Sequence, residues 1–184
     1  SLSLCNEVVC YCLNKIIFII AMVPLQFFIL KKVEILKLIE SDHHIIQVKF
    51  VNVEKNSLFV GDIFQTISSM NVNIDMISEV MLEDEMRIDF TCSQDDQKNL
   101  DRALSLIRSK HPRMQIYQNR QVAKIKLESH EMKDEVGVAA MLFTLLGKHQ
   151  IPLLQVTTSE VSISCVIPLE YVDLALSEIQ NEYK

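Results

Sequence analysis

Residues 151–164 read IPLLQVTTSEVSIS, and the type of fold is most readily predicted from this segment. Most of its residues are apolar or β-branched, which is typical of extended chain. We expect two consecutive strands here, over residues 151–158 and 159–167, with no helix between them. Strands joined so closely in sequence pair in antiparallel fashion, so the stretch predicts a β-hairpin.

The sequence on both sides of this hairpin alternates between strand and helix periodicities, and the same order of elements occurs twice. The first copy has strands predicted over 45–53, 72–80, 86–92 and 113–117, and helices over 58–69 and 96–109. The second copy adds to the hairpin a strand over 122–127 and helices over 137–148 and from Pro168 through Ile179. This order predicts an α+β fold of two ferredoxin-like βαββαβ units, each a four-stranded antiparallel sheet with two helices on one face.

The two copies align so that Phe64 falls on Phe143 and Ile74 on Leu153. We expect residues 1–40 to be a leader or linker, 41–119 to form the first unit and 120–184 the second. The second copy reaches Lys184 without a closing strand. We therefore expect residues 33–39 to supply that strand, which would insert the first unit into the second.

Composition excludes several kinds of function. The 184 residues include 18 Lys and Arg against 24 Asp and Glu, a net charge of -6. A nucleic-acid partner is not expected, because phosphate binding needs clustered positive charge. The three glycines, Gly61, Gly137 and Gly147, are too scattered to form a phosphate-binding loop.

Cysteine and histidine give no sign of a metal site or of a disulfide framework. The five cysteines, an odd number without regular spacing, indicate a reduced, cytoplasmic protein. No histidine pairs at helical spacing with a second ligand, so neither a metal ion nor a cofactor is expected.

The apolar segment 16–30 makes a poor membrane span. A helix of this length extends roughly 22 Å, short of the hydrocarbon core of about 30 Å. A buried helix or a poorly ordered leader is the better interpretation, and no membrane association is expected.

Several stretches resemble the paired ACT domains of aspartate kinases. The run Thr157-Thr158-Ser159-Glu160-Val161 is distinctive of the hairpin in the second domain of that family. Weaker similarities are VNIDMI over 72–77, DFTC over 89–92, MKDEVGVA over 132–139 and SDHHI over 41–45. The family's kinase signature of the Lys-Phe-Gly-Gly type does not occur in this sequence.

The resemblance implies a regulatory region that binds an end-product amino acid and inhibits an aspartate kinase catalytic domain. A helix amino terminus suits the carboxylate of an amino acid, and the carbonyls of a strand edge suit its ammonium group. The residues expected to bind the effector in the first unit are Asn56, Phe59 and Val60 in a loop and first helical turn, and Asn73, Ile74 and Asp75 on a strand. Those expected in the second unit are Met132, Glu135, Gly137, Thr158, Ser159 and Glu160.

Asp75, Ser78 and Glu79 match positions that hold the ligand in lysine-inhibited aspartate kinases. Two carboxylates suit the lysine ε-ammonium, so lysine is favoured over threonine as effector. An ordinary solvated strand end is the alternative explanation of these side chains. No catalytic residues are expected, because no nucleophile lies near a base in the pattern.

Two other functions share this fold: an amino-acid sensor with no attached kinase, and an oligomerisation module. A third alternative is an enzyme on a ferredoxin-like fold. Such an enzyme would need a set of catalytic side chains that converge on one place, and the sequence shows no such set. A homodimer is expected, because edge strands would otherwise expose unpaired backbone.

Overall fold

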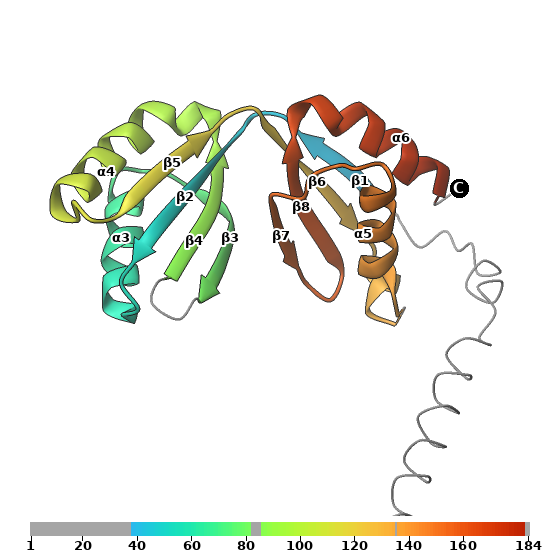
Figure 1. Cartoon of the computed structure of the whole chain (residues 1–184), viewed down its shortest axis with the longest axis horizontal. Coiled ribbons are helices and arrows are strands. Elements are labelled where there is room, and N and C mark those ends of the chain that lie inside the picture. Colours follow the sequence, from blue (N-terminus) through green and yellow to red (C-terminus); the bar gives the residue numbers. More distant parts are fainter. Residues whose placement is uncertain (1–37, 82–85, 135, 183–184) are drawn as a thin grey trace, which may run out of the picture. The chain divides into compact units, whose positions relative to one another are not determined.

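The computed structural model describes residues 38–81, 86–134 and 136–182, and these form two four-stranded antiparallel sheets (Figure 1). The strand orders are β3-β4-β2-β5 and β1-β6-β8-β7. The first unit comprises β2 (Ile45–Val53), α3 (Ser57–Ser69), β3 (Ile74–Met81), β4 (Met86–Ser93), the 3₁₀ helix η1 (Gln94–Asp96), α4 (Gln97–Lys110) and β5 (Gln115–Asn119). The second comprises β1 (Leu38–Asp42), β6 (Val122–Glu128), η2 (His130–Lys133), α5 (Val138–Lys148), β7 (Gln155–Thr158), β8 (Ser162–Pro168), η3 (Leu169–Tyr171) and α6 (Val172–Glu182).

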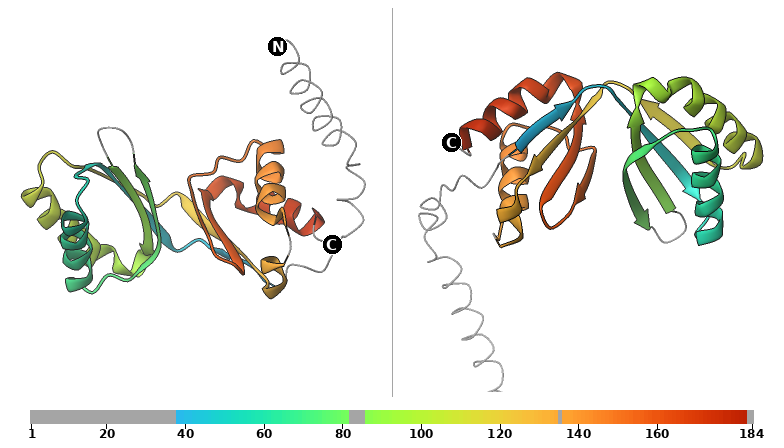
Figure 2. Two further views of the ribbon diagram at one scale, coloured as in Figure 1. Left: turned by 90° about the horizontal axis from the view of Figure 1, so that it is seen from below. Right: turned by 180° about the vertical axis from the view of Figure 1, so that it is seen from behind.

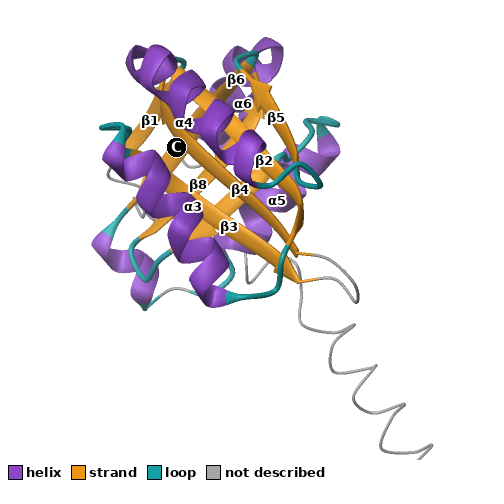
Figure 3. Ribbon diagram, turned by 90° about the vertical axis from the view of Figure 1, so that its left-hand side faces the viewer, coloured by secondary structure: helices purple, strands orange, loops and turns teal. Residues whose placement is uncertain are grey.

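Each sheet has its two long helices on one face, which confirms the predicted ferredoxin-like units. Helices α3 and α4 lie over the first sheet, as Figure 3 shows from the helix side, and α5 and α6 lie over the second. Between α3, α4 and the first sheet, Phe90 lies at the centre of the core, with its ring centroid 5.5 Å from that of Phe50 and 6.1 Å from that of Phe64. Aromatic pairs at these distances add to the stability that burial of their surface provides.

The first helices of the two units end in the same way, as the repeat predicts. Asn71 follows α3 with φ of 61°, and Gln150 follows α5 with φ of 54°. The backbone N–H of Val72 then donates to the carbonyl of Ile67, four residues before Asn71. In the second unit Ile151 donates to Leu146 in the same pattern, which is that of a Schellman helix end.

Strand β1 precedes the first unit in the chain and belongs to the sheet of the second. It pairs with β6 along its whole length, from Leu38 opposite Glu128 to Asp42 opposite Lys124, and the two strands lie side by side in Figure 2. The first unit is therefore inserted between β1 and β6. The strand ends three residues later than the predicted 33–39, and residues 33–37 lie outside the described part of the chain.

The hairpin of the second unit is shorter than expected. Strand β7 begins at Gln155 instead of residue 151, and residues 159–161 form the turn instead of opening the next strand. Pro152 lies in the segment that does not join the sheet, and a proline cannot donate to a strand ladder.

Side chains from both units are buried together at a place that we call the seam. Its apolar part consists of Ile45 and Met76 from the first unit and Val122 and Val166 from the second. Its polar part is a pair of buried glutamines, Gln47 and Gln155, described below.

None of the described helices has the length and apolar character that a bilayer span requires. The apolar segment 16–30 lies outside the described residues.

Candidate functional site

The amino-terminal end of α3 carries three of the residues predicted to bind an effector. Asn56 is the N-cap, and its Oδ1 accepts a hydrogen bond of 2.9 Å from the backbone N–H of Leu58. Phe59 and Val60 lie in the first turn and pack, partly buried, against the core of the first unit. Asn56 therefore stabilises the helix start with no ligand present, because its side chain satisfies a backbone donor that the helix leaves free.

Asn73, Ile74 and Asp75 lie where β3 begins. The backbone N–H of Asn73 donates to Oδ2 of Asp96 over 3.3 Å, and Ile74 packs against the core. Asp75 lies where the register of β3 against β4 shifts, and its Oδ2 accepts a hydrogen bond of 3.4 Å from the buried Thr91 hydroxyl. The irregularity turns the Asp75 side chain toward the seam.

These two groups of predicted residues lie at opposite ends of the first sheet. Val53, which leads into α3, pairs with Met86 at the start of β4. Ile74 pairs with Cys92 near the end of the same strand, which is about 20 Å away at roughly 3.3 Å per residue. One unit therefore does not bring Asn56 and Asp75 together around a single amino acid.

The structure also separates the carboxylates that suggested lysine. Beyond the irregularity, Glu79 is opposite Ile88, a core residue on the helix side of the sheet. Ser78 is opposite Asp89, one residue further along β4 and thus on the other face. Asp75 points to the seam, so Asp75 and Glu79 do not converge on one ammonium group.

Of the residues predicted in the second unit, Thr158, Ser159 and Glu160 lie at the end of its sheet where β6 finishes, because the backbone N–H of Ser129, directly after β6, donates to the carbonyl of Val161. The backbone N–H of Ser159 donates to the carbonyl of Ser162 over 2.8 Å, and the two hydroxyls are also 2.8 Å apart. These bonds close the turn that contains Glu160 and follows Thr158, so the distinctive run has a structural role in the hairpin. Of the remaining residues, Met132 is buried in η2, Gly137 starts α5 with φ of 99°, and Glu135 lies outside the described residues.

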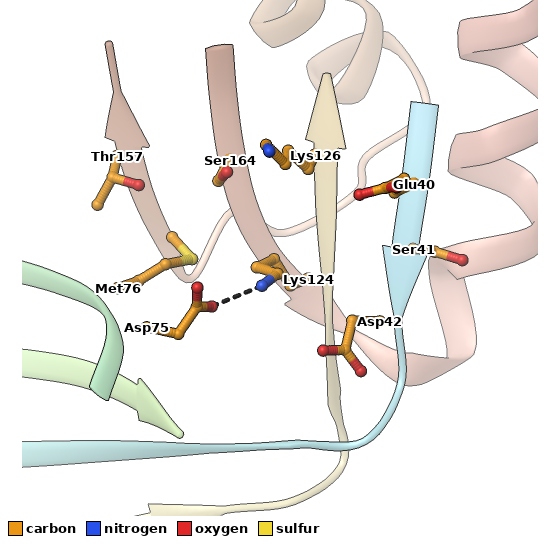
Figure 4. A pocket seen from close by; sticks show the side chains of 9 residues that line it. All are labelled: Glu40, Ser41, Asp42, Asp75, Met76, Lys124, Lys126, Thr157 and Ser164. Carbon is orange, nitrogen blue, oxygen red and sulfur yellow. Dashed lines mark hydrogen bonds and ion pairs between the residues drawn. The ribbon is translucent and has the colours of Figure 1, made fainter. Parts of the chain in front are cut away.

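A cavity of about 490 Å³ lies beside the seam, and this is the candidate site; we call it the seam pocket (Figure 4). Its residues are Glu40, Ser41, Asp42, Asp75, Met76, Lys124, Lys126, Thr157 and Ser164.

Sheet register builds the floor of the seam pocket. Glu40 is opposite Lys126, Lys126 is opposite Ser164, and Ser164 is opposite Thr157. A single row across β1, β6, β8 and β7 thus places an acid, a base and two hydroxyls on one face. In the next row, Asp42 is opposite Lys124. Because cross-strand partners point to the same face, both signs of charge line the cavity.

The first unit contributes the charge that faces this floor. The Nζ atom of Lys124 lies 2.6 Å from Oδ2 of Asp75, and Figure 4 shows the two side chains pointing toward each other. Lys126 instead pairs with Glu128 on its own strand. The hydrogen bond from Lys126 lowers the pKa of Glu128, and the same bond raises the pKa of Lys126.

Sequence reasoning found one of the charged residues in the seam pocket, Asp75, and missed the others. Lys124 and Lys126 alternate along a predicted strand, which places both on one face. Their acidic neighbours could not be identified in the same way. Glu40 lies beside Lys126 only because β1 crosses from the start of the chain to β6.

A second cavity, of about 430 Å³, lies where β2 leads into α3. Phe59, one of the predicted effector residues, lines it, with its ring centroid 4.4 Å from that of His111. The other residues around this cavity are Asn52, Val53, Glu54, Lys110, Pro112, Arg113 and Met114. Glu54 is the one acidic residue among those that line this cavity, whereas the seam pocket is lined by Glu40, Asp42 and Asp75.

In the described part of the chain, no three His, Cys, Asp or Glu side chains lie together in a way that could hold a metal ion.

Comparisons with known proteins agree with this fold. Residues 125–183 match the family model of the ACT domain. The aspartokinase of Helicobacter pylori (strain ATCC 700392 / 26695) is 27% identical over 139 residues, which are 75% of this chain and 34% of that protein. Aspartokinase 2 of Bacillus subtilis (strain 168) is 26% identical over 125 residues, 68% of this chain and 31% of that protein. The chain thus spans about a third of the length of these relatives.

Among solved structures, the ligand-free regulatory subunit of aspartate kinase from Thermus thermophilus is similar, with a TM-score of 0.75 and 20% identity. The similarity covers 82% of this chain and 99% of that one. The match therefore extends over the whole of a chain that has the same two-sheet fold. Together, these findings show a tandem ACT fold whose sequence is similar to the regulatory region of aspartate kinases.

Proposed function

We propose that this chain is the amino-acid-binding regulatory region of an aspartate kinase, and that it gives feedback inhibition by lysine or threonine in the cytoplasm. The observation that carries the proposal is the 27% identity to an aspartokinase over 139 residues, which reaches across both ACT units. The structure of the Thermus thermophilus regulatory subunit supports the fold part of this argument.

The charges of the seam pocket suit a zwitterionic effector. Its two lysines can bind a carboxylate, and its acidic residues can bind an ammonium group. A volume of about 490 Å³ falls in the range of small-molecule sites. The second cavity offers Lys110 and Arg113 to a carboxylate, with fewer acids for an ammonium group.

The choice between lysine and threonine is more even than the sequence suggests. The preference for lysine rests on two carboxylates that act together, and Asp75 and Glu79 point to different faces of β3. Asp75 also has Lys124 as a cationic partner within the chain. We therefore propose the two amino acids as equal candidates.

A homodimer is part of the proposal. β3 is an edge strand, and its exposed apolar side chains are Ile77, Val80 and Met81. Edge strands with such side chains are prone to pair with another chain. A second copy of this chain would cover them.

Thermal unfolding with a panel of the twenty amino acids tests the function. A ligand that binds only the folded chain stabilises it by about 2.7 kcal/mol at a concentration of 100 Kd. We expect lysine or threonine to raise the Tm, and glycine and glutamate to leave it unchanged. A Tm that none of the twenty shifts would favour an oligomerisation module instead.

A further inference from the structure

The seam pocket contains an ion pair that a small zwitterion could replace with two. Lys124 and Asp75 are 2.6 Å apart and belong to different ACT units. We propose that the seam pocket binds an α-amino acid. The ammonium group of this ligand pairs with Asp75 and its carboxylate pairs with Lys124, so that both residues exchange their present ion pair for one with the ligand. The proposal rests on the proposed function, because it assigns the effector a site.

The exchange is electrostatically balanced. One pair of opposite charges becomes two pairs, and no charge is left without a partner. The Asp75 side chain is 43% exposed and that of Lys124 is 17% exposed, so water partly screens their present ion pair. A ligand that fills the cavity excludes some of that water and strengthens both new pairs.

Asp75 is held in place for this role from within its own unit. The Thr91 hydroxyl, which is fully buried, donates to Oδ2 of Asp75 over 3.4 Å and accepts from the backbone N–H of Met76 over 3.2 Å. These two bonds fix the irregularity that points Asp75 into the pocket. The carboxylate therefore keeps its position when Lys124 moves to a new partner.

The floor of the seam pocket has hydrogen-bonding groups available for the rest of the ligand. Among the residues that the structure describes, the side-chain hydroxyls of Thr157 and Ser164 make no hydrogen bond, and both residues are half-buried. Lys126 and Glu40 continue the same row. A polar side chain on the amino acid would meet these four groups.

Such a ligand would also bridge the two units. Asp75 belongs to β3 and Lys124 to β6, so an amino acid between them connects both ACT units through its own backbone atoms. Binding would thus replace a direct contact between the units with one that depends on the effector concentration.

Equilibrium dialysis of the full chain with radiolabelled lysine and threonine tests the assignment. The variants are Asp75→Asn and Lys124→Met, which remove one charge each. The matched control is Lys98→Met, because Lys98 is exposed on α4, on the helix side of the first unit, and lines neither of the two cavities. Thermal unfolding of each variant without ligand verifies that it folds.

We expect both pocket variants to weaken binding of the effector at least about tenfold, because each loses a charge-assisted hydrogen bond. Lys98→Met should leave the affinity for the effector within about twofold of the wild-type value. The amide of the bound amino acid, which lacks the carboxylate, should bind the wild type and Lys124→Met about equally.

The outcomes separate this inference from the proposed function. Unchanged affinity in Asp75→Asn and Lys124→Met, with loss in Asn56→Ala, would place the site at α3 and overturn the inference alone. Failure of the wild-type chain to bind either amino acid would overturn the proposed function as well.

Discussion

Gln47 and Gln155, from different ACT units, form a hydrogen bond of 3.2 Å between buried side-chain amides. The Nε2 atom of Gln155 donates again, over 3.3 Å, to the backbone carbonyl of Asp89. Within the described part of the chain, Oε1 of Gln47 is buried without a partner. The seam therefore combines apolar packing with a polar contact that is only partly satisfied.

Replacing one glutamine of this pair should cost more than replacing both. Gln155→Met leaves the amide of Gln47 buried without its partner, which we expect to lower the free energy of unfolding by about 1–3 kcal/mol. The double variant with Gln47→Met removes both amides and should recover most of that loss. Urea unfolding measures both, and a double variant whose loss equals the sum of the single losses would contradict this account of the seam.

Asp89 should make stability depend on pH. Burial raises the pKa of this carboxyl from its usual value of 3.8, against the opposing effect of Lys49, which lies 3.4 Å away. The folded chain therefore binds this proton more tightly than the unfolded chain. The stabilisation is complete below pH 3.8 and is lost as pH rises through the folded pKa.

The Asp89→Asn variant should accordingly gain in Tm relative to the wild type at pH 7, and the gain should shrink at pH 3. The exposed Asp134→Asn is the matched control, for which we expect no such pH-dependent difference. A gain that is the same at both pH values would show that burial of the Asp89 charge is not its cause.

The two cysteines of the ACT units should be unreactive in the folded chain. Burial raises the pKa of the Cys165 thiol to about 12, and burial together with the charge of Asp96 raises that of Cys92 to about 12. At pH 8 only about one thiol in ten thousand is then the reactive thiolate.

A variant with Ser at positions 5, 10 and 12 isolates these two thiols. We expect a thiol-disulfide reagent at pH 8 to label neither of them quickly in buffer and both of them quickly in urea. Rapid labelling of one thiol without urea would mean that its strand opens readily.

Two asparagines predicted to bind the effector should differ in their effect on stability. Asn56 caps α3 through its side chain, whereas Asn73 uses its backbone N–H. We expect Asn56→Ala to lower the free energy of unfolding by about 0.5–2 kcal/mol and Asn73→Ala to change it little. Equal losses in urea unfolding would contradict the capping role.

Much of the fold follows from local patterns in the sequence. Strand β2 was predicted at its observed bounds, because apolar and polar residues alternate through Ile45–Val53. The predicted hairpin is longer than the observed one. Leu153 and Leu154 continue the apolar pattern of a strand, but they follow Pro152 in a loop, and β7 begins only at Gln155. The repeat also predicts that a strand from before the first unit completes the second sheet, because the second copy has no strand after its last helix. Strand β1 has this place beside β6.

The candidate site was less accessible from the sequence, because it depends on register between distant strands. The resemblance to aspartate kinases identifies Asp75, yet its partner Lys124 is 49 residues away in the sequence and belongs to the other unit. The irregularity that separates Asp75 from Glu79 leaves no local signal, since both lie in an ordinary strand sequence. The predicted residues at the start of α3 and at the start of β3 are close in the sequence, and the structure places them at opposite ends of the first sheet.

Isothermal titration calorimetry of the full chain with lysine and with threonine tests whether the paired ACT units bind an amino-acid effector. We expect saturable binding of at least one of the two amino acids to the unmodified, folded chain. The absence of binding heat for both, up to millimolar concentrations and with the chain shown to be folded in the same cell, would contradict it.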